Sequence, residues 1–524
     1  MTSQTKKNIK FDFKIIVFWA IMLLAFSVRF LKLGEIPEGI NQDEALTGYD
    51  AFLLLTTGAD HWGIKNPVYL MGWGSGTSVL YALLAKVSFY IFDVNVWALR
   101  LPQAVMGLLG CYVFYLTLKL FYDKTSALTG LFLFSIMPWA VMNSRWGLDA
   151  NVAPMFWLLG FYFYCRAVKD IRYLFISAIF YALTMYAYAG FWLFMAITLP
   201  LQWGYLLWIK NDKKVLLNAF LSGLLFILLI LPLVWLVLVN FGIVSEYKGE
   251  FFSVPKLLFW RGGEVGLNDF KNKFRMFSNL LFKQNDGWLS NMIPSYGLFY
   301  LFSPILVVVG LVSQGIKAKK DVLAKQFSFD LVIICLIVIG LLNALCVYAF
   351  SNRVNFLFVP LTVALTIGVV TFRHIKVLFY GVMIAYFICF MSFCKTYFGN
   401  YNQMIAKHYS FSFSYGLKDA LYKADELHAK EGADIYLLEE LYAYSKVLFY
   451  NKINPYAYRR TVEWYDYPNA FVQAKQFLYY HFVWEQDYEH LESGKIYIAH
   501  KDKIAYFAGM PYQEYGNYIV AFMK

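Results

Sequence analysis

A succession of long apolar segments constrains this chain more than any other feature of its sequence. Each has about the length that crosses the hydrocarbon core of a bilayer, roughly 20 residues. They are residues 15–31, 76–92, 99–121, 125–142, 151–167, 172–189, 190–208, 215–239, 296–316, 328–350, 354–371 and 377–394. Apolar residues make up 60% of the chain and charged residues 15%, whereas an average soluble domain is roughly 45 to 50% apolar. The sequence therefore predicts a polytopic membrane protein and excludes a disordered, fibrous or disulfide-framework protein.

The basic residues predict how these segments cross the membrane. Lys6, Lys7, Lys10 and Lys14 precede the first segment, so the positive-inside rule places the N-terminus in the cytoplasm. If 76–92 does not cross, the later basic clusters also lie in the cytoplasm. These are Lys119/Lys124, Arg166/Lys169/Arg172, Lys210/Lys213/Lys214, Lys317/Lys319/Lys320/Lys325 and Arg373/Lys376. We therefore expect about eleven transmembrane helices, with 76–92 as a juxtamembrane or re-entrant helix against the outer face.

The composition changes near Lys395, where the apolar segments end and Tyr, Lys, Asp and Glu become frequent. We expect two parts, a transmembrane region at 1–394 with outer loops 34–98 and 240–295, and a soluble extracytoplasmic domain at 395–524. Helical spacing at 416–431 and strand patterns at Asp434–Glu439 and Lys495–His500 predict a small α/β domain. The fold class is thus an all-α polytopic membrane protein with a small C-terminal α/β domain.

Charge and cysteine usage exclude several functions. The formal net charge is +12, but the basic residues lie in short clusters between apolar segments, so no nucleic-acid partner is expected. The six Cys residues lie inside or at the end of apolar segments, which predicts neither a disulfide framework nor a metal site. The sequence contains no P-loop and no G-x-G-x-x-G motif, and we expect no nucleotide cofactor.

The first outer loop contains two adjacent acids, Asp43 and Glu44, at the start of an amphipathic helix. One interpretation is structural, because Asn41 and Glu44 have the spacing of a capping box and Asp43 suits the positive end of the helix dipole. The other is a functional site at the membrane surface. The two side chains differ by about 100° around a helix, so both cannot point fully into one cavity. Asp50 shares the face of Asp43.

Two further outer turns carry candidate site residues. Arg145 and Asp149 occupy the short loop 143–151, where a helix-end ion pair is the structural alternative to a site. Asn352 and Arg353 lie between two apolar segments, at the depth of lipid phosphates. An ionisable residue there is costly unless it has a partner or a function, and snorkelling or pairing with a carboxylate is the alternative.

The long loop 240–295 combines basic and aromatic residues. Arg261, Lys271, Lys273, Arg275 and Lys283 alternate with Phe270, Phe274, Phe277 and Phe282. This pattern is typical of an interfacial helix that binds anionic headgroups, and most of these residues are expected to be surface anchors. Arg275 and Asp286 are the candidate substrate-binding residues of this loop.

Together these motifs resemble the GT-C superfamily of membrane glycosyltransferases, closest to the protein O-mannosyltransferase-like enzymes of family 39 and to lipid A aminoarabinose transferase. The resemblance covers residues 1–394. It is carried by Gly39-Ile40-Asn41-Gln42-Asp43-Glu44, Arg100-Leu101-Pro102, Ser144-Arg145-Trp146-Gly147-Leu148-Asp149 and Asn352-Arg353. The His-Pro-Pro or Lys-Pro-Pro signature of the family is absent, and Lys65-Asn66-Pro67 and Gly72-Trp73-Gly74-Ser75-Gly76 occupy its region.

The resemblance implies that Asp43 is the catalytic base and that Asp149 supports the acceptor or donor site, with Glu44, Arg145, Arg353, Asn352, Arg275 and Asp286 as substrate-binding candidates. The implied reaction moves a sugar from a polyprenyl-phosphate donor to an envelope glycan or lipid on the outer face. A single base and direct attack predict inversion at the anomeric carbon, and neither a cofactor nor an obligatory metal is expected. The alternatives are a protein O-mannosyltransferase acting on secreted proteins, a polytopic lipid or sugar transporter, and a non-catalytic scaffold.

Overall fold

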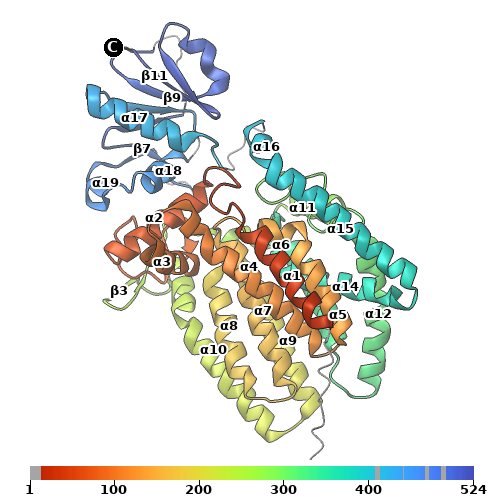
Figure 1. Cartoon of the computed structure of the whole chain (residues 1–524). Helices are drawn as coiled ribbons and strands as arrows, with labels where there is room; N and C mark the ends of the chain where they lie inside the picture. The colour runs from red at the N-terminus through yellow and green to blue at the C-terminus, as the bar shows by residue number, and fades with distance from the viewer. Residues whose placement is uncertain (1–12, 408–412, 441, 466–470, 485–490, 524) are drawn as a thin grey trace, which may run out of the picture.

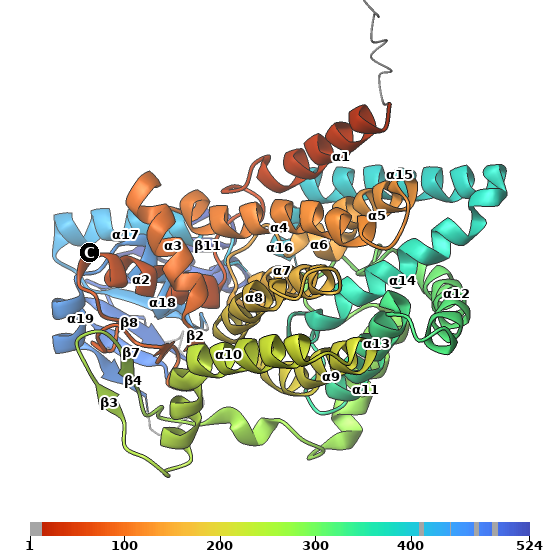
Figure 2. The ribbon, with the colours of Figure 1, turned by 90° about the horizontal axis from the view of Figure 1, so that it is seen from below.

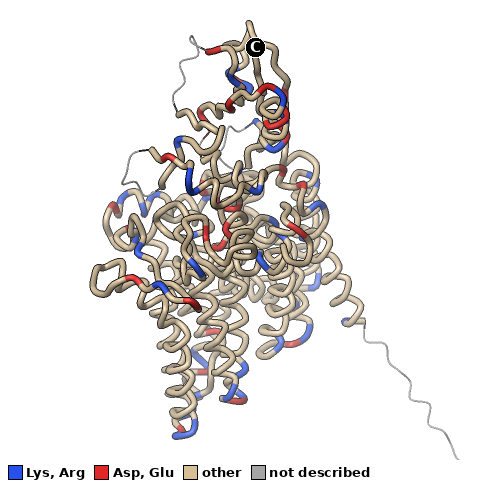
Figure 3. Tube along the Cα trace, turned by 90° about the vertical axis from the view of Figure 1, so that its left-hand side faces the viewer, with Lys and Arg blue, Asp and Glu red and all other residues tan. Residues whose placement is uncertain are grey.

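The computed structural model describes residues 13–407, 413–440, 442–465, 471–484 and 491–523. A bundle of helices makes up one part, and a mixed sheet with its helices makes up the other (Figure 1). Charged residues are sparse along the helices of the bundle and are more frequent at their ends and in the C-terminal part (Figure 3). The mostly helical fold with a small C-terminal sheet domain agrees with the predicted fold class.

The helical part runs from α1 to α16. Its helices are α1 (Phe13–Phe30), α2 (Gln42–Thr56), α3 (Leu80–Phe92), α4 (Val96–Lys119), α5 (Lys124–Ile136), α6 (Pro138–Met142), α7 (Asp149–Ala167), α8 (Tyr173–Ala187), α9 (Trp192–Lys210), α10 (Lys213–Asn240), α11 (Phe270–Lys283), α12 (Ser303–Leu323), α13 (Phe329–Ala344), α14 (Phe358–Thr371), α15 (Lys376–Gly399) and α16 (Tyr401–Lys407). Short 3₁₀ turns η1 (Ala189–Phe191), η2 (Arg261–Glu264), η3 (Ser351–Arg353) and η4 (Asn355–Leu357) connect some of them.

Six helical segments of the described chain are long and apolar enough to cross a membrane. They are Phe13–Phe30, Val96–Lys119, Ala189–Lys210, Lys213–Asn240, Asn355–His374 and Lys376–Gly399. Leu80–Phe92, Lys124–Ile136, Tyr173–Ala187 and Phe329–Ala344 are apolar but shorter. The predicted segment 125–142 is divided into α5 and α6, because Met137 is extended ahead of Pro138. The number of eleven crossings stays a prediction.

The C-terminal part is a seven-stranded sheet in the order β10-β11-β9-β5-β8-β7-β6. Its strands are β5 (Ile435–Leu438), β6 (Glu463–Trp464), β7 (Ala474–Phe477), β8 (Tyr480–Val483), β9 (Ile496–His500), β10 (Tyr512–Tyr515) and β11 (Tyr518–Phe522). The central strand β5 is parallel to β8 and β9, and the other pairs are antiparallel. Helices α17 (Leu417–Glu431), α18 (Ala443–Tyr450) and α19 (Pro455–Thr461) accompany it. The helix predicted at 416–431 and the strands at 434–439 and 495–500 are confirmed.

Helices α2 and α3 lie between the sheet and the rest of the bundle (Figures 1 and 2). The loops 34–98 and 240–295 each contain a short hairpin. The first loop pairs β1 (Tyr69–Leu70) with β2 (Thr77–Ser78), and the second pairs β3 (Tyr247–Lys248) with β4 (Ser253–Val254). Residues 34–98 therefore contact both parts of the molecule, and the candidate site lies there.

Close helix packing within the bundle depends on small residues. A Cβ atom at Gly310 on α12 would lie 1.8 Å from the carbonyl oxygen of Ala364 on α14. A Cβ at Gly368 would lie 1.9 Å from the carbonyl oxygen of Leu306. Small residues at a helix crossing allow the two backbones to approach, as is common in membrane helix pairs.

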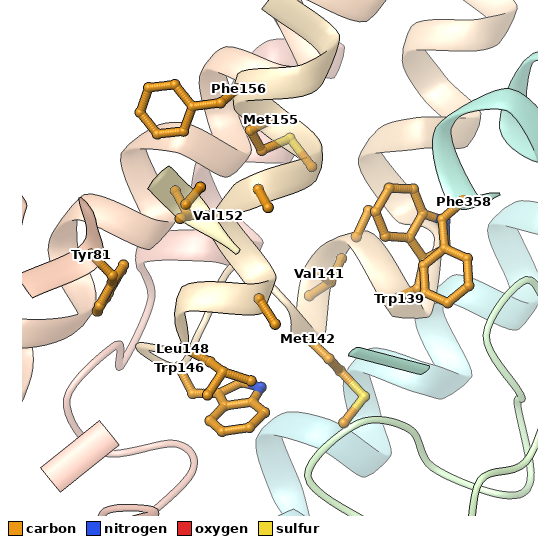
Figure 4. Packing of buried hydrophobic residues seen from close by; sticks show 14 of the residues in the cluster. Tyr81, Trp139, Val141, Met142, Trp146, Leu148, Val152, Met155, Phe156 and Phe358 are labelled. Atoms are coloured by element: carbon orange, nitrogen blue, oxygen red, sulfur yellow. The ribbon is translucent and has the colours of Figure 1, made fainter. Parts of the chain in front are cut away.

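The loop ahead of α7 is packed into the protein core. Figure 4 shows Trp146 and Leu148 in this loop and Val152, Met155 and Phe156 along α7. All five side chains are buried. Because the loop is fixed from both sides, the N-terminus of α7 and the residue Asp149 that begins it have a defined position.

Candidate active site

Helix α2 begins with the capping box that the sequence predicts. The Asn41 side chain accepts a hydrogen bond from the Asp43 backbone N–H (2.9 Å), and Glu44 Oε2 accepts one from the Asn41 N–H (3.4 Å). This arrangement satisfies N–H groups that the helix itself leaves unpaired. It also fixes the rotation of α2, so the side chains of Asp43 and Glu44 leave the helix in different directions.

Glu44 forms a buried ion pair with Arg100 of α4. Arg100 Nε lies 2.8 Å from Glu44 Oε1, its second terminal nitrogen donates to Oε2 at 2.9 Å, and both side chains are fully buried. Arg100 also donates to the carbonyls of Pro37 and Gly39. Glu44 Oε1 accepts a further bond from the Gly147 N–H (2.7 Å). The prediction that Glu44 binds substrate is therefore corrected, because both of its oxygens are occupied inside the protein.

Arg145 also has a structural position. Its guanidinium donates to the carbonyls of Val28, Arg29, Leu31, Lys32 and Ile36, at the C-terminal end of α1 and just beyond it. A cation at this end of a helix satisfies carbonyls that have no partner within the helix. The Arg145 side chain is 0% exposed, which corrects its prediction as a substrate-binding residue. Its guanidinium binds these carbonyls instead of forming the helix-end ion pair with Asp149.

The two candidates of the long loop lie apart from the acids of the first loop. Asp286 lines a separate cavity, and its Oδ2 accepts hydrogen bonds from the Ser351 N–H (2.9 Å) and the Asn291 side chain (2.8 Å). It thereby holds the turn η3, which carries Arg353. Arg275 is exposed on α11. Neither side chain lines the cavity that contains Asp43, and their assignment as substrate-binding residues stays a prediction.

Asp43, Asp149, Asn352 and Arg353 line one cavity of about 180 Å³. The other lining residues come from α2, the first loop, the start of α7, the residue before η1, the long loop and the C-terminal part. They are Leu46, Thr47, Asp50, Gly72, Trp73, Ser75, Gly76, Thr77, Leu148, Ala150, Tyr188, Arg261 and Phe471. Three carboxylates, of Asp43, Asp50 and Asp149, thus share a polar chamber with two guanidinium groups.

Asp43 is oriented by Trp73. The indole Nε1 donates a hydrogen bond to Asp43 Oδ1 at 2.7 Å, and the Trp73 ring packs edge-on against Tyr442 and Tyr444 of the C-terminal part. Burial raises the pKa of Asp43, although the Trp73 hydrogen bond and the charges of Arg261 and Arg353 oppose this rise. A carboxylate with a raised pKa is a stronger base than one in water.

Asp149 faces the same chamber at the start of α7, ahead of the apolar segment 151–167. Its oxygens accept hydrogen bonds from the backbone N–H groups of Ala150 (2.7 Å) and Ser78 (3.4 Å). Burial raises the pKa of Asp149 to about 7, with a smaller contribution from the charge of Asp43. A buried acid with a shifted pKa in a cavity is a candidate for a functional residue.

Arg261 and Arg353 form a cationic pair bridged by Glu264. Arg261 donates to both carboxylate oxygens of Glu264 (2.6 and 2.7 Å), and an Arg353 terminal nitrogen lies 3.7 Å from Glu264 Oε2. The Arg261 guanidinium lies over the Phe471 ring at 5.0 Å. The sequence predicts Arg261 as one of the basic residues of an interfacial helix that binds anionic headgroups, most of them surface anchors, and it does not identify Glu264 or Phe471. The loop 240–295 contains five acids and seven basic residues, so its sequence does not single out Glu264.

A second, larger cavity of about 380 Å³ adjoins the first. Apolar residues of α9, α10, the long loop and the segment after α13 form much of its wall, including Trp192, Leu193, Val237, Val265 and Val347. The two cavities share lining residues, which are Ser75, Gly76, Asp149, Tyr188, Arg261 and Arg353. The cationic pair therefore lies where a polar chamber meets an apolar one.

Among the described residues, no group of three or more His, Cys, Asp or Glu side chains is placed to hold a metal ion. Arg261 and Arg353 are the cations that the two cavities share. The arrangement can hold an anion beside a base, with space for an apolar chain on one side.

Comparison with known proteins confirms the GT-C fold that the resemblance implies. The sequence model of the dolichyl-phosphate-mannose-protein mannosyltransferase family matches residues 77–237. No curated protein matches the chain by sequence. The structure is similar to that of ArnT from Cupriavidus metallidurans bound to undecaprenyl phosphate, with a TM-score of 0.55, 10% identity and 97% of each chain covered. The Archaeoglobus fulgidus oligosaccharyltransferase gives a TM-score of 0.47 at 13% identity, covering 83% of this chain and 61% of that one. The chain has the GT-C fold.

The position of Glu44 predicts a large effect on stability. Glu44→Gln leaves the buried Arg100 guanidinium without its counter-charge, and breaking such a pair typically costs about 3 to 5 kcal/mol. We expect the purified variant to lose its folded state at a clearly lower temperature than wild type, measured by thermal unfolding in detergent. Glu35→Gln, which changes an exposed acid of the same loop, is the control and should unfold like wild type. Equal thermal stability of all three proteins would contradict the structural role of Glu44.

Proposed function

We propose that the protein is an inverting glycosyltransferase that moves a sugar from a polyprenyl-phosphate-linked donor to a glycan or lipid acceptor of the cell envelope, on the outer face of the membrane. The observation that carries this proposal is the junction of the two cavities. Arg261 and Arg353 line both the polar chamber that contains Asp43 and the apolar chamber beside it. A lipid phosphate has this combination of an anionic head and an apolar chain.

The proposed chemistry needs one base and a stabilised leaving group. A lipid-phosphate leaving group is already anionic, so only the proton of the acceptor hydroxyl must be removed. Asp43 takes that proton while the acceptor oxygen attacks the anomeric carbon. Arg261 and Arg353 stabilise the negative charge that develops on the departing phosphate. Attack from the face opposite the phosphate inverts the anomeric configuration.

Asp149 is proposed to orient the acceptor or the sugar. It lines both cavities, and its pKa near 7 allows it to donate or accept a hydrogen bond near neutral pH. Asn352, next to Arg353 in η3, supplies an amide to the same chamber. Phe471 adds an aromatic surface from the C-terminal part, and we propose that this part contributes to acceptor binding.

The names of the similar proteins support the donor class. The matching family acts with dolichyl-phosphate mannose on proteins, and the ArnT structure contains undecaprenyl phosphate. The family name also favours a second candidate function, mannosyl transfer to secreted proteins. Mass spectrometry of envelope glycans, glycolipids and secreted proteins, with and without the active gene product, separates the two acceptor classes. The multi-pass arrangement with a cytoplasmic N-terminus and an extracytoplasmic C-terminal domain is part of the proposal.

Replacing the base tests the proposed activity directly. Asp43→Asn keeps the size of the side chain and can accept the Trp73 hydrogen bond, but it cannot take a proton at neutral pH. We expect sugar transfer by the purified protein to fall by about 10² to 10⁴-fold, the usual contribution of a general base, with unchanged thermal unfolding. Glu35→Gln is again the control. Transfer at the wild-type rate by folded Asp43→Asn protein would exclude Asp43 as the base, and a wild-type protein that moves lipid without transferring sugar would support a transporter.

The hydrogen bond from Trp73 predicts a shift in the pH profile. Asp43 acts as a base only when deprotonated, so kcat/KM is lost as the pH falls through its pKa. The Trp73 bond favours the carboxylate and lowers this pKa, so Trp73→Phe should raise it and move the acidic limb of the profile to higher pH by about one unit. Trp62→Phe is the matched control, because the Trp62 indole donates to the Gly72 carbonyl instead. An acidic limb that stays in place or moves to lower pH in Trp73→Phe would refute this assignment.

A further inference from the structure

Glu264 places a negative charge where the proposed function requires a phosphate. Its carboxylate accepts two hydrogen bonds from Arg261 and lies 3.7 Å from Arg353. It lines the apolar cavity together with both arginines. The proposed chemistry does not use Glu264, and a carboxylate beside an anion site weakens anion binding unless it has another role.

The position of Glu264 is fixed by the surrounding loop. Lys273 of α11 is buried, and its Nζ donates to the carbonyls of Glu264 (2.8 Å), Gly266 (2.9 Å) and Cys346 (3.2 Å). The Gly266 N–H also donates to the Cys346 carbonyl at 2.9 Å. These bonds tie the loop carrying Arg261 and Glu264 to the segment after α13, which leads to Arg353. The three charged groups are therefore held as one unit.

Glu264 remains ionised in this setting. Burial opposes ionisation, but the hydrogen bonds and charge of Arg261, and then the charges of Arg353 and Lys273, hold the pKa of Glu264 below its usual value. The charged and titratable groups around it are Arg261, Arg353, Lys273, Tyr348, Asp149, Tyr188 and Tyr69. Two guanidinium groups and one carboxylate leave the bridged unit with one net positive charge.

The proposed reaction changes the charge of the bound phosphate. The donor is a phosphodiester with a single negative charge. During transfer the bond between the anomeric carbon and the phosphate oxygen breaks, its electron pair stays on that oxygen, and the acceptor oxygen bonds to the carbon while Asp43 receives the acceptor proton. The lipid product is a phosphomonoester, which carries about −1.5 to −2 at pH 7 because its second pKa is about 6. The Glu264 carboxylate offsets one of the two guanidinium charges beside the phosphate, so less of the product's additional negative charge is compensated.

We infer that Glu264 is a specificity-determining residue that makes this site prefer the phosphodiester donor over the phosphomonoester product. The inference rests on the proposed function and extends it. Repulsion from the Glu264 carboxylate acts on both lipids, but it is larger for the product because the product carries more charge. Glu264 thereby promotes departure of the spent lipid carrier after each transfer.

The test compares two lipid probes that differ in charge. Undecaprenyl phosphate is the monoester probe, and its methyl ester is a phosphodiester with the same chain. Binding to the purified full chain in detergent is measured by quenching of tryptophan fluorescence at pH 7.5 and pH 5.5. For Glu264→Gln we expect the monoester to bind about 10-fold more tightly than to wild type at pH 7.5 and the diester only about 3-fold more tightly. At pH 5.5, where the monoester is largely a monoanion, the two gains should become similar.

Two controls separate charge from loop structure. Glu264→Asp retains the carboxylate and should keep the wild-type preference, while Glu250→Gln changes an exposed acid of the same loop and should have no effect. Equal gains for both probes at pH 7.5, or weaker binding of both by Glu264→Gln, would overturn the inference while leaving the lipid-phosphate site intact. Failure of wild type to bind either probe would instead overturn the proposed function together with the inference.

Discussion

The buried ion pair between Glu44 and Arg100 is the interaction on which the candidate site depends. It ties the first turn of α2 to α4, and the Glu44 carboxylate also holds the loop ahead of α7 through the Gly147 N–H. Because the capping box fixes the rotation of α2, the inward direction of Glu44 leaves Asp43 facing the cavity. Desolvating two charges is costly, and here that cost is offset by a bidentate pair and by carbonyl partners on Arg100. Because of this pair, Glu44 has a structural role, while the adjacent Asp43 lines the cavity.

The second constraint is the placement of charge at the boundary between a polar and an apolar chamber. Arg261 comes from the long loop and Arg353 from the turn before η4, so two segments distant in sequence supply the pair. The C-terminal part completes the wall, because Phe471 lies against Arg261 and the Val472 N–H donates to the Trp73 carbonyl at 2.9 Å. Trp73 in turn orients Asp43. Asp43, Arg261 and the C-terminal part are thereby linked through Trp73, Val472 and Phe471.

Much of the fold could be predicted from the sequence because its signals are local. Each signal depends on residues that are close in the sequence. The length of the apolar segments predicts the helices, the capping box predicts the start of α2, and the strand patterns predict β5 and β9. The 100° separation of Asp43 and Glu44 correctly indicated that only one of them faces the cavity. The positions of the basic clusters predict that the loops of Asp43, Asp149 and Arg353 lie on one side of the membrane. The structure brings these three residues to one cavity.

The remaining parts of the site depend on partners that are distant in sequence. In the sequence Arg145 has the features of a binding residue. Only the tertiary fold surrounds it with the carbonyls at the end of α1 and just beyond it. Arg261 has the same sequence pattern as the anchors of the long loop, and only the tertiary fold turns it towards Asp43. Phe471 belongs to a part of the chain where the sequence carries no motif.

A structure of the protein with undecaprenyl phosphate bound would test the proposed lipid-phosphate site most directly. We expect the phosphate to lie between Arg261 and Arg353, with the polyprenyl chain in the cavity lined by Trp192 and Val237. A phosphate bound away from both arginines, with no path from it to Asp43, would contradict the account.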